Sequence, residues 1–410
     1  MALNYIWIGF FLIAIVVAFF KLIFFQDLEV FKQIIDTLFS RAELGFKLSI
    51  GLTGILALWM GIMKIGENGG AVKMLAKLVS PLFTRIFPEV PKNHKSIGSM
   101  VMNFSANMLG LDNAATPMGL KAMGDLQELN PHKEKASNAQ IMFLVLNTSG
   151  LTIIPVSIMA LRASSGSTDP TGIFLPILIA TFISSLVGLI VTSIIQKINL
   201  FQPVIMGYLG GAVALLGLFF WYLNGLDKEA LGIASSLISN ILIYSIIIFF
   251  IILGLLKKIN IYESFIEGAK EGFTIAIKII PYLIAMLCAI GVFTASGAME
   301  FLLDGLANVF AALGIDTRFV NGLPTAIMKP LSGGGARGLM VDSWATHGVD
   351  SFVGNLTSVL QGSTETTFYV LAVYFGSVGI KNTRYAVFAG LIADLAGIIA
   401  AIFIAYYFFG

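Results

Sequence analysis

Long apolar stretches separated by short polar segments dominate the chain. Those with few polar positions are residues 5–25, 44–65, 172–195, 203–223, 231–256, 272–295 and 385–409. About 20 apolar residues form a helix long enough to cross a bilayer, so we expect each stretch to span a membrane. The first stretch lacks a basic leader and a small-residue cleavage site, which favours a retained transmembrane helix over a signal peptide.

A second pattern is amphipathic and predicts helices that lie in the membrane interface. In residues 28–42, Phe31, Ile35 and Leu38 share one helical face, while Asp36 lies off it. The same pattern occurs in residues 71–87, 262–270 and 298–313. We therefore expect an interfacial helix beside each of the spans 44–65 and 272–295.

Two segments have apolar ends and polar centres, and neither fits an ordinary span. Residues 96–123 and 320–344 each contain a proline and several polar residues in their middle. Two arms of about 12 helical residues reach about 18 Å each, whereas the hydrocarbon core is about 30 Å thick. We predict re-entrant hairpins, whose unwound tips must contact protein or a cavity at that depth.

Residues 141–161 and 352–380 are long enough to span a membrane but contain polar breaks at 147–150 and 361–366. Hydroxyls and amides often join membrane helices by hydrogen bonds. The second break also contains Glu365, and a carboxylate near the bilayer centre costs about 3 kcal/mol or more on insertion scales. Such a group usually pairs or faces a cavity, so we predict a functional site around Glu365. Residues 162–171 are expected to form a short polar loop.

Composition supports a membrane protein and excludes several other classes. The chain is 57% hydrophobic and 12% charged, against about 25% charged residues in a soluble domain. A net charge of +2 gives no support for nucleic-acid binding. Cys288 is the one cysteine and the three histidines are not at ligand spacing, so we expect no metal site and no cofactor. No zinc-protease motif occurs, and Ser332 with Lys329 makes a weak dyad, so we do not expect an enzyme.

The second half of the chain echoes the first. Gly70 matches Gly297, and the break within residues 145–152 aligns with the break within 359–366. Each half is expected to contain a span, an interfacial helix, a hairpin, a broken span and a span.

Charge indicates that the two repeats are inverted. Lys73 and Lys77 align with Glu300 and Asp304, which have the opposite sign at the same helix positions. Lys and Arg concentrate on the cytoplasmic side, so this swap is expected when equivalent helices lie on opposite faces. Inverted repeats with broken helices are typical of secondary transporters, which bind solute and ions near the midplane between the repeats.

Two motifs resemble known families. NMLGLDNAATP at 107–117 with GLKAM at 119–123 resembles the bacterial spore maturation protein A family, and QGSTETTFYVLAVYFG at 361–376 resembles the spore maturation protein B family. Both belong to the gate, or nucleoside-recognition, superfamily, whose relatives include concentrative nucleoside transporters and the gate segments of the ferrous-iron permease. The resemblance implies a fusion of the two and a role in spore-core dehydration, but the family name does not fix a ligand.

These observations predict an all-α integral membrane protein of the bacterial inner membrane, with two inverted gate-type repeats, re-entrant hairpins, broken transmembrane helices and interfacial amphipathic helices. The expected domains are 1–43 (N-terminal span and interfacial helix), 44–197 (first repeat, spore maturation protein A-like), 198–258 (linking spans) and 259–410 (second repeat, spore maturation protein B-like).

The predicted binding site combines both hairpin tips with both breaks. Its first-half residues are Asn103, Ser105, Asn107, Asp112, Asn113, Thr116, Asn147, Thr148 and Ser149. Its second-half residues are Lys329, Ser332, Arg337, Asp342, Gln361, Ser363, Thr364, Glu365 and Thr366. Glu365 is a candidate for a coupling proton or cation, and Lys329 or Arg337 for an anionic solute group; alternatively, Glu365 forms a structural ion pair with one of them. Asp394, in an unbroken span, is expected to support the site indirectly.

Two functions fit these predictions. One is a secondary transporter or permease for a small solute, nucleoside-like or other, with a coupling proton or sodium ion. The other is a non-transporting membrane scaffold or regulator, which should pack its polar hairpin groups together and leave no water-filled cleft. Membrane lipid is the expected environment, nucleic acid is not an expected partner, and a homo-oligomer is left open.

Overall fold

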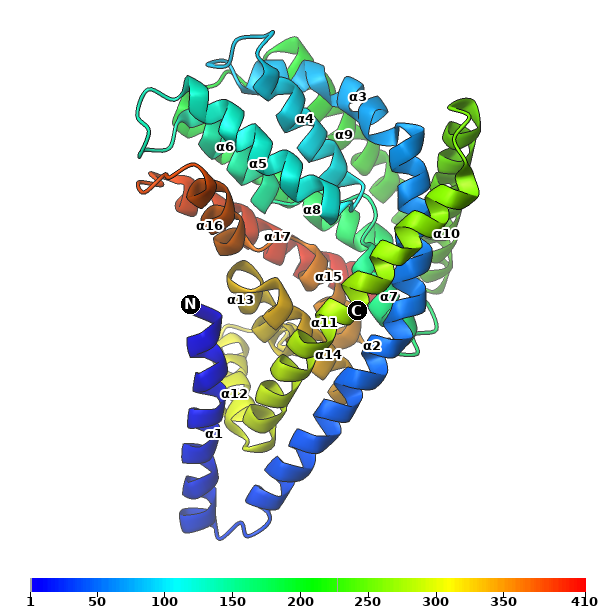
Figure 1. Cartoon of the computed structure of the whole chain (residues 1–410). Helices are drawn as coiled ribbons and strands as arrows, with labels where there is room; N and C mark the ends of the chain where they lie inside the picture. Colours follow the sequence, from blue (N-terminus) through cyan, green and yellow to red (C-terminus); the bar gives the residue numbers. More distant parts are fainter. Residues whose placement is uncertain (1, 227) are drawn as a thin grey trace.

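The computed structural model describes residues 2–226 and 228–410, with the side chains of all of these except 2, 3, 112–114, 228 and 229. Within these residues the protein is all-helical, with one 3-10 helix and no β-strand (Figure 1). Seven helices of this part are long and apolar enough to cross a membrane. They are α1, α2, α8, α9, α10, α11 and α17. This confirms the expected class, an all-α integral membrane protein.

The helices follow one another with short connections. The first half contains α1 (Ala2–Phe25), α2 (Val30–Gly69), α3 (Ala71–Ile86), α4 (Lys95–Met108), α5 (Asp112–Leu129), α6 (Asn138–Thr148), α7 (Val156–Ser164) and α8 (Phe174–Gln196). The linking helices are α9 (Pro203–Leu223) and α10 (Lys228–Leu256). The second half contains α11 (Ile261–Ala295), α12 (Ala298–Ala312), η1 (Arg318–Gly322), α13 (Leu323–Leu331), α14 (Gly333–His347), α15 (Phe352–Gly362), α16 (Thr367–Ser377) and α17 (Ala386–Phe409).

The same order of elements occurs in both halves. A long helix, α2 or α11, is followed by a short one, α3 or α12, after a glycine with positive φ: 91° at Gly70 and 86° at Gly297. A helical hairpin follows, α4–α5 or α13–α14, then a broken helix, α6–α7 or α15–α16, and a final span, α8 or α17. The hairpin α4–α5 lies at the top of Figure 1 and α13–α14 lies below the middle. The inverted orientation and the re-entrant path of the hairpins stay predictions.

The prediction of a separate interfacial helix at 28–42 was wrong, and the amphipathic segment 262–270 is likewise continuous with the span that follows it. Residues 30–69 form one helix, α2, and residues 261–295 form one helix, α11. The junction Arg41–Leu44 contains good helix formers and neither Gly nor Pro. Gly272, the first residue of the predicted span 272–295, lies inside α11, where it packs against α2. A helix pattern that changes from amphipathic to apolar is therefore not evidence of a helix end.

Helices α2 and α11 run antiparallel and pack closely through glycines (Figure 1). A Cβ atom at Gly272 would lie 2.6 Å from the Leu56 carbonyl oxygen, and one at Gly268 would collide with the Met60 carbonyl oxygen. Gly268 and Gly272 form a small-xxx-small pair, which lets two membrane helices approach backbone to backbone. This contact joins the first half of the chain to the second.

We expect Gly272→Ala to destabilise the protein by about 1–3 kcal/mol, because the added methyl group has no room beside the α2 backbone. The measurement is thermal unfolding of the purified protein in detergent. Gly217→Ala in α9 is the matched control, since no heavy atom lies within 4 Å of a Cβ there. Equal melting temperatures for both variants would contradict this packing.

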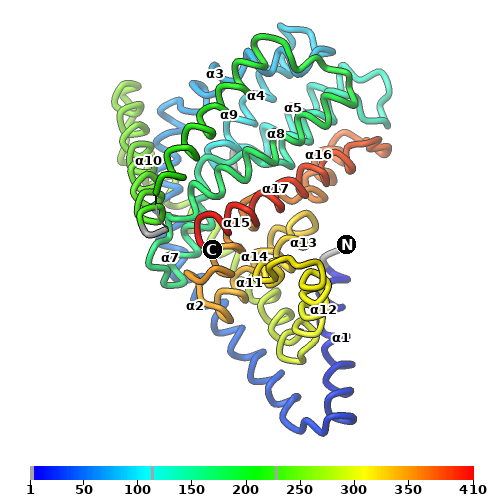
Figure 2. Tube along the Cα trace, turned by 180° about the vertical axis from the view of Figure 1, so that it is seen from behind, coloured from blue at the N-terminus to red at the C-terminus, as the bar shows by residue number. Residues whose placement is uncertain are grey.

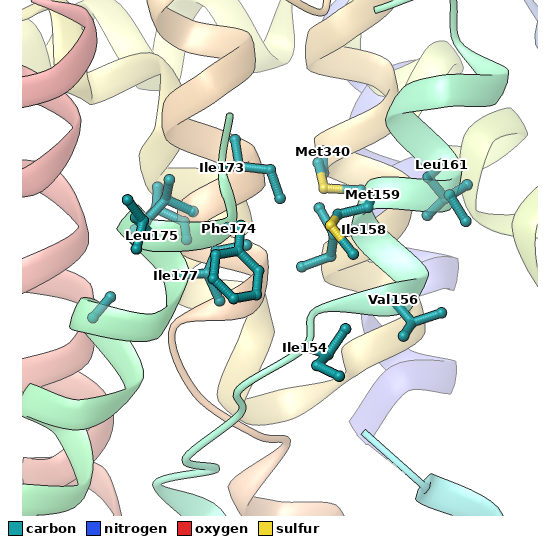
Figure 3. Packing of buried hydrophobic residues seen from close by; sticks show 14 of the residues in the cluster. Ile154, Val156, Ile158, Met159, Leu161, Ile173, Phe174, Leu175, Ile177 and Met340 are labelled. Carbon is teal, nitrogen blue, oxygen red and sulfur yellow. The ribbon is translucent and has the colours of Figure 1, made fainter. Parts of the chain in front are cut away.

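The core of the molecule includes the breaks. Helix α7, the segment before it and the start of α8 bury a group of apolar side chains, together with Met340 of α14 (Figure 3). The labelled members are Ile154, Val156, Ile158, Met159, Leu161, Ile173, Phe174, Leu175, Ile177 and Met340. The view from behind shows α17 and α15 beside α8 and α14 (Figure 2). The two halves therefore share one core around the broken helices.

Candidate functional site

A cavity of about 870 Å³ lies between the two halves. Its walls come from the ends of α4 and α6, from α5 and α7, and from the faces of α2 and α11. The second half adds α13, the N-terminal turn of α14, the break between α15 and α16, and α16 itself. Ligand sites are commonly concave, mostly apolar and supplied with a few polar groups. This cavity has such a lining, and it is where the sequence placed a site.

The structure brings most of the predicted site residues to this cavity. Those that line it are Asn107, Thr116, Asn147, Lys329, Ser332, Arg337, Gln361, Thr364, Glu365 and Thr366. Others are fully buried next to the lining: Asn103, Ser105, Thr148, Ser149 and Ser363. The side chains of Asp112 and Asn113 lie outside the described residues. Asp342 lies away from the cavity and forms an ion pair with Arg41 of α2 at 2.7 Å.

In the first half, the polar lining is organised by amide groups. Asn107 Nδ2 donates to Asn147 Oδ1 at 2.8 Å, which connects the hairpin α4–α5 to the end of α6. Asn103 Nδ2 donates to the Ala115 carbonyl at 2.8 Å and to the Tyr374 hydroxyl at 3.3 Å. The Tyr374 hydroxyl also donates to Asn147 Oδ1 at 3.4 Å. A residue of the second half thus completes the polar network of the first.

In the second half, the hairpin tip is the start of α14. The Ser332 hydroxyl caps this helix by accepting from the Gly335 amide at 3.0 Å. Gln361 Nε2 donates to the Gly333 carbonyl at 3.2 Å, while Gln361 Oε1 is buried without a hydrogen-bond partner in the described part of the chain. A Cβ atom at Gly333 would lie 2.6 Å from Thr366 Oγ1, so the hairpin tip contacts the break directly.

The two breaks meet each other. The Glu365 amide donates to the Thr148 carbonyl at 2.9 Å, so each break supplies one partner of a backbone hydrogen bond. Gly150 has φ of 60°, and a Cβ atom there would lie 2.8 Å from Glu365 Cγ. The first break also contacts its own hairpin, because the Ile153 amide donates to the Met108 carbonyl at 2.7 Å. These bonds satisfy backbone groups that would otherwise be unpaired inside a membrane.

Glu365 differs from its polar neighbours because its side chain is exposed where it lines the cavity. The alternative of a structural ion pair between Glu365 and Lys329 or Arg337 stays a prediction. Lys329 is 6% exposed and belongs to the wall formed by α13. Because the Glu365 carboxylate faces the cavity, it can contact water, an ion or a solute there.

Sequence reasoning missed several groups at the cavity. Thr152 and Ser157 line it from the first break and α7, and Tyr369 and Tyr374 line it from α16. Thr152 could have been identified from the sequence, because it aligns with the predicted site residue Thr366 in the repeat. Tyr369 and Tyr374 lie in an apolar stretch of the sequence. Residue type alone does not indicate there which side of the helix faces the cavity.

The loop predicted at 162–171 was wrong at its start, since Arg162 belongs to α7 and is 2% exposed. Its guanidinium donates to the Val349 carbonyl at 3.0 Å, to Ser358 Oγ at 3.1 Å and to Asp350 Oδ1 at 2.9 Å. Arg162 therefore fastens the first broken helix to the loop that precedes α15. A buried arginine of this kind looks like a loop residue in the sequence because its charge suggests solvent.

The Asp350 carboxyl is the ionic partner of Arg162 in this contact. Its partial burial alone would raise its pKa, but hydrogen bonds from Ser167 and Thr168 and the charge of Arg162 outweigh burial and hold the pKa below its ordinary value. The Thr168 amide and hydroxyl donate to Asp350 Oδ2 at 2.8 and 2.9 Å. A carboxyl whose pKa is lowered by folding stabilises the folded state in its ionised form.

The contribution of Asp350 should be present above its unfolded pKa of about 3.9 and should disappear as pH falls through the lower folded pKa. We expect Asp350→Asn to lower the melting temperature at neutral pH, with the difference from wild type shrinking in acid. Melting curves in detergent across this pH range measure it. Asp304→Asn, at an exposed position of α12, is the control. A difference that stays constant in acid would contradict the role of the ionised carboxylate.

The fold and the cavity define a multi-pass α-helical membrane protein with a polar site between two similarly ordered halves. The Gate family, described as nucleoside recognition, matches twice, at residues 49–165 and 276–381. The chain belongs to this family. Its two matches fall on the two halves described above, one on each side of the linking helices α9 and α10.

Two curated relatives are each similar to part of the chain. Spore maturation protein B of Bacillus subtilis (strain 168) is 50% identical over 181 residues, which cover 44% of this chain and 95% of that protein. Spore maturation protein A of the same organism is 36% identical over 160 residues, which cover 39% of this chain and 82% of that protein. The predicted resemblance to a fusion of these two proteins is confirmed.

Proposed function

We propose that the chain is a secondary transporter or permease for a small solute, and that the cavity between its two halves is the solute site. The observation that carries the proposal is a cavity of about 870 Å³ whose lining includes the exposed Glu365 carboxylate and both helix breaks. A scaffold needs no such space. A transporter needs a polar site that both halves build, because relative motion of the halves then opens it to alternate sides.

The arrangement of the breaks supports this motion. The halves meet at the breaks through the hydrogen bond from the Glu365 amide to the Thr148 carbonyl, and at α2 and α11 through glycines. Rocking of one half against the other around the α2–α11 contact changes the cavity walls without unfolding a helix. The solute is a small polar molecule by the size and lining of the cavity. The family's description, nucleoside recognition, makes nucleoside-like compounds the first class to test.

A membrane scaffold or regulator of the spore-maturation type is the second candidate function. The polar network around the first break favours it, because Asn107, Asn147 and Asn103 of the first half and Tyr374 of the second are joined by hydrogen bonds. Such a network rigidifies a fold whether or not a solute passes. The names of the curated relatives refer to spore maturation and not to transport.

Purified protein in vesicles should accumulate a solute under a proton or sodium gradient, and Glu365→Gln should reduce this uptake strongly, because the carboxylate faces the cavity. Glu300→Gln, at an exposed position of α12 outside the cavity, is the matched control and should transport like wild type. Full uptake by Glu365→Gln would remove this residue from the solute site.

A thermal-shift screen separates the two functions before any solute is known. Nucleosides, cations, dicarboxylates and lipid-linked precursors are the classes to test. A ligand of the folded state stabilises it by about 2.7 kcal/mol at a hundredfold excess over its Kd. We expect at least one class to raise the melting temperature, and Gln361→Ala in the cavity wall to weaken that shift. Absence of any shift in the wild type would favour the scaffold.

A further inference from the structure

Asp394 is a buried carboxyl that the cavity does not reach. It lies in α17, is 1% exposed and does not line the cavity. Thr367 Oγ1 donates to Asp394 Oδ2 at 2.6 Å, but Asp394 Oδ1 has no hydrogen-bond partner among the described residues. Burying a carboxylate with an unpaired oxygen is costly, so the group is stable only when it is protonated or holds a cation.

The surface of α17 around Asp394 is shaped to bring oxygen atoms close. Gly390 and Gly397 lie one helical turn on either side of Asp394 and share its face. A Cβ atom at Gly397 would lie 3.0 Å from the Ser363 carbonyl oxygen, and one at Gly390 would lie 3.0 Å from Thr367 Cγ2. The glycines therefore let the break between α15 and α16 press against the carboxyl. The C-terminal end of α15 adds a partial negative charge there.

Thr364 stands between Asp394 and the cavity. Its hydroxyl is buried without a hydrogen-bond partner among the described residues, and its side chain packs on α17 one helical turn from Asp394. Thr364 also lines the cavity, and its Cγ2 would contact a Cβ atom placed at Gly397. One residue of the break thus faces the solute site on one side and the buried carboxyl on the other.

Charged side chains of both signs act on Asp394. Six helices in the described part of the chain pack against α17, and four of them, α6, α8, α15 and α16, contain no Asp, Glu, Lys or Arg. The other two are α10, whose charged residues Lys228 and Glu229 are confined to its first turn, and α13, which contains Lys329. Lys329 of α13 attracts the carboxylate, and Glu365 of the break repels it. The attraction and the repulsion partly offset each other, and Asp394 Oδ1 still lacks a hydrogen-bond partner among the described residues.

We propose that Asp394 Oδ1 and the Thr364 hydroxyl bind the coupling ion, a proton or a sodium ion, behind the wall of the solute cavity. With a proton, Oδ1–H donates to Thr364 Oγ1 and both carboxyl oxygens are satisfied. With sodium, the same two oxygens and the nearby Ser363 carbonyl are ligands of the type that a hard cation prefers. Glu365, which is exposed in the cavity, then contacts the solute and not the ion. Ion binding stands without transport, and its coupling role rests on the proposed function.

Ion occupancy and the cavity are connected through the break. When the ion leaves, Asp394 keeps a negative charge that repels the Ser363 and Thr364 oxygens and the Glu365 carboxylate. Residues 361–366, which include four cavity-lining side chains, are then pushed from α17. The solute site is therefore expected to form in the ion-bound state, which is the linkage that a coupled transporter requires.

The test is thermal unfolding of the full-length chain in detergent, with sodium chloride titrated against choline chloride at constant ionic strength, between about pH 5 and pH 8. A saturable rise in melting temperature with sodium identifies sodium as the ion. A melting temperature that is indifferent to sodium and falls as pH rises identifies the proton, because the buried carboxyl must then lose it. Asp394→Asn should remove whichever response the wild type shows, while Glu365→Gln and the exposed control Asp304→Asn should keep it.

Three results overturn the assignment. They are a wild type without either response, an Asp394→Asn variant with the full response, and a Glu365→Gln variant that loses it. If Asp394→Asn does not fold, Thr364→Val decides, because it removes one proposed ion ligand and keeps the side-chain shape; an unchanged response then rejects the site. Vesicle uptake separates this from the proposed function. An ion response without solute uptake rejects transport, and uptake without an ion response rejects the ion site.

Discussion

Broken helices inside a membrane create unpaired backbone groups, and the structure depends on how these groups are satisfied. Water is not available there, so each freed N–H or carbonyl must find a partner in protein or in a cavity. Here the second break provides an amide, at Glu365, and the first provides a carbonyl, at Thr148. Each break also contacts the tip of its own hairpin, at Met108 and at Gly333. The cavity lies where the two breaks and the two hairpin tips meet. The hydrogen bonds that satisfy the freed backbone groups therefore also shape its walls.

Much of this architecture could be predicted from the sequence, because polar residues in apolar runs are conspicuous. The breaks at 147–150 and 361–366 and the two hairpins appear where amides, hydroxyls and glycines interrupt the pattern. Helix ends in the amphipathic segments were predicted less well. Nothing in the hydrophobic pattern distinguishes a helix that ends at residue 42 from one that continues as α2, because the chain there contains neither Gly nor Pro.

The residues of the candidate site also fall into those that could be predicted from the sequence and those that could not. Residues that interrupt an apolar run, such as Asn107 and Glu365, were recognised and line the cavity. Groups that depend on tertiary contacts were not. Tyr374 reaches the first-half amides only because the two breaks bring α16 beside α6, and Arg162 is buried only because the loop before α15 supplies its acceptors. Asp394 was seen in the sequence, but its unpaired oxygen becomes visible only when Thr364 and Thr367 are in place.

The linking helices α9 and α10 pack mostly along the outside of the molecule, yet they have a consequence for its assembly (Figure 2). They join the two halves of a chain that is similar over parts of its length to two separate curated proteins. Were the halves separate chains, the bond from Glu365 to Thr148 and the cavity around it would form only on encounter in the membrane, at a rate set by the abundance of each. A covalent connection replaces that encounter with a high effective concentration and a fixed ratio of one to one. The supply of complete cavities in the cell is then governed by the expression of one gene product.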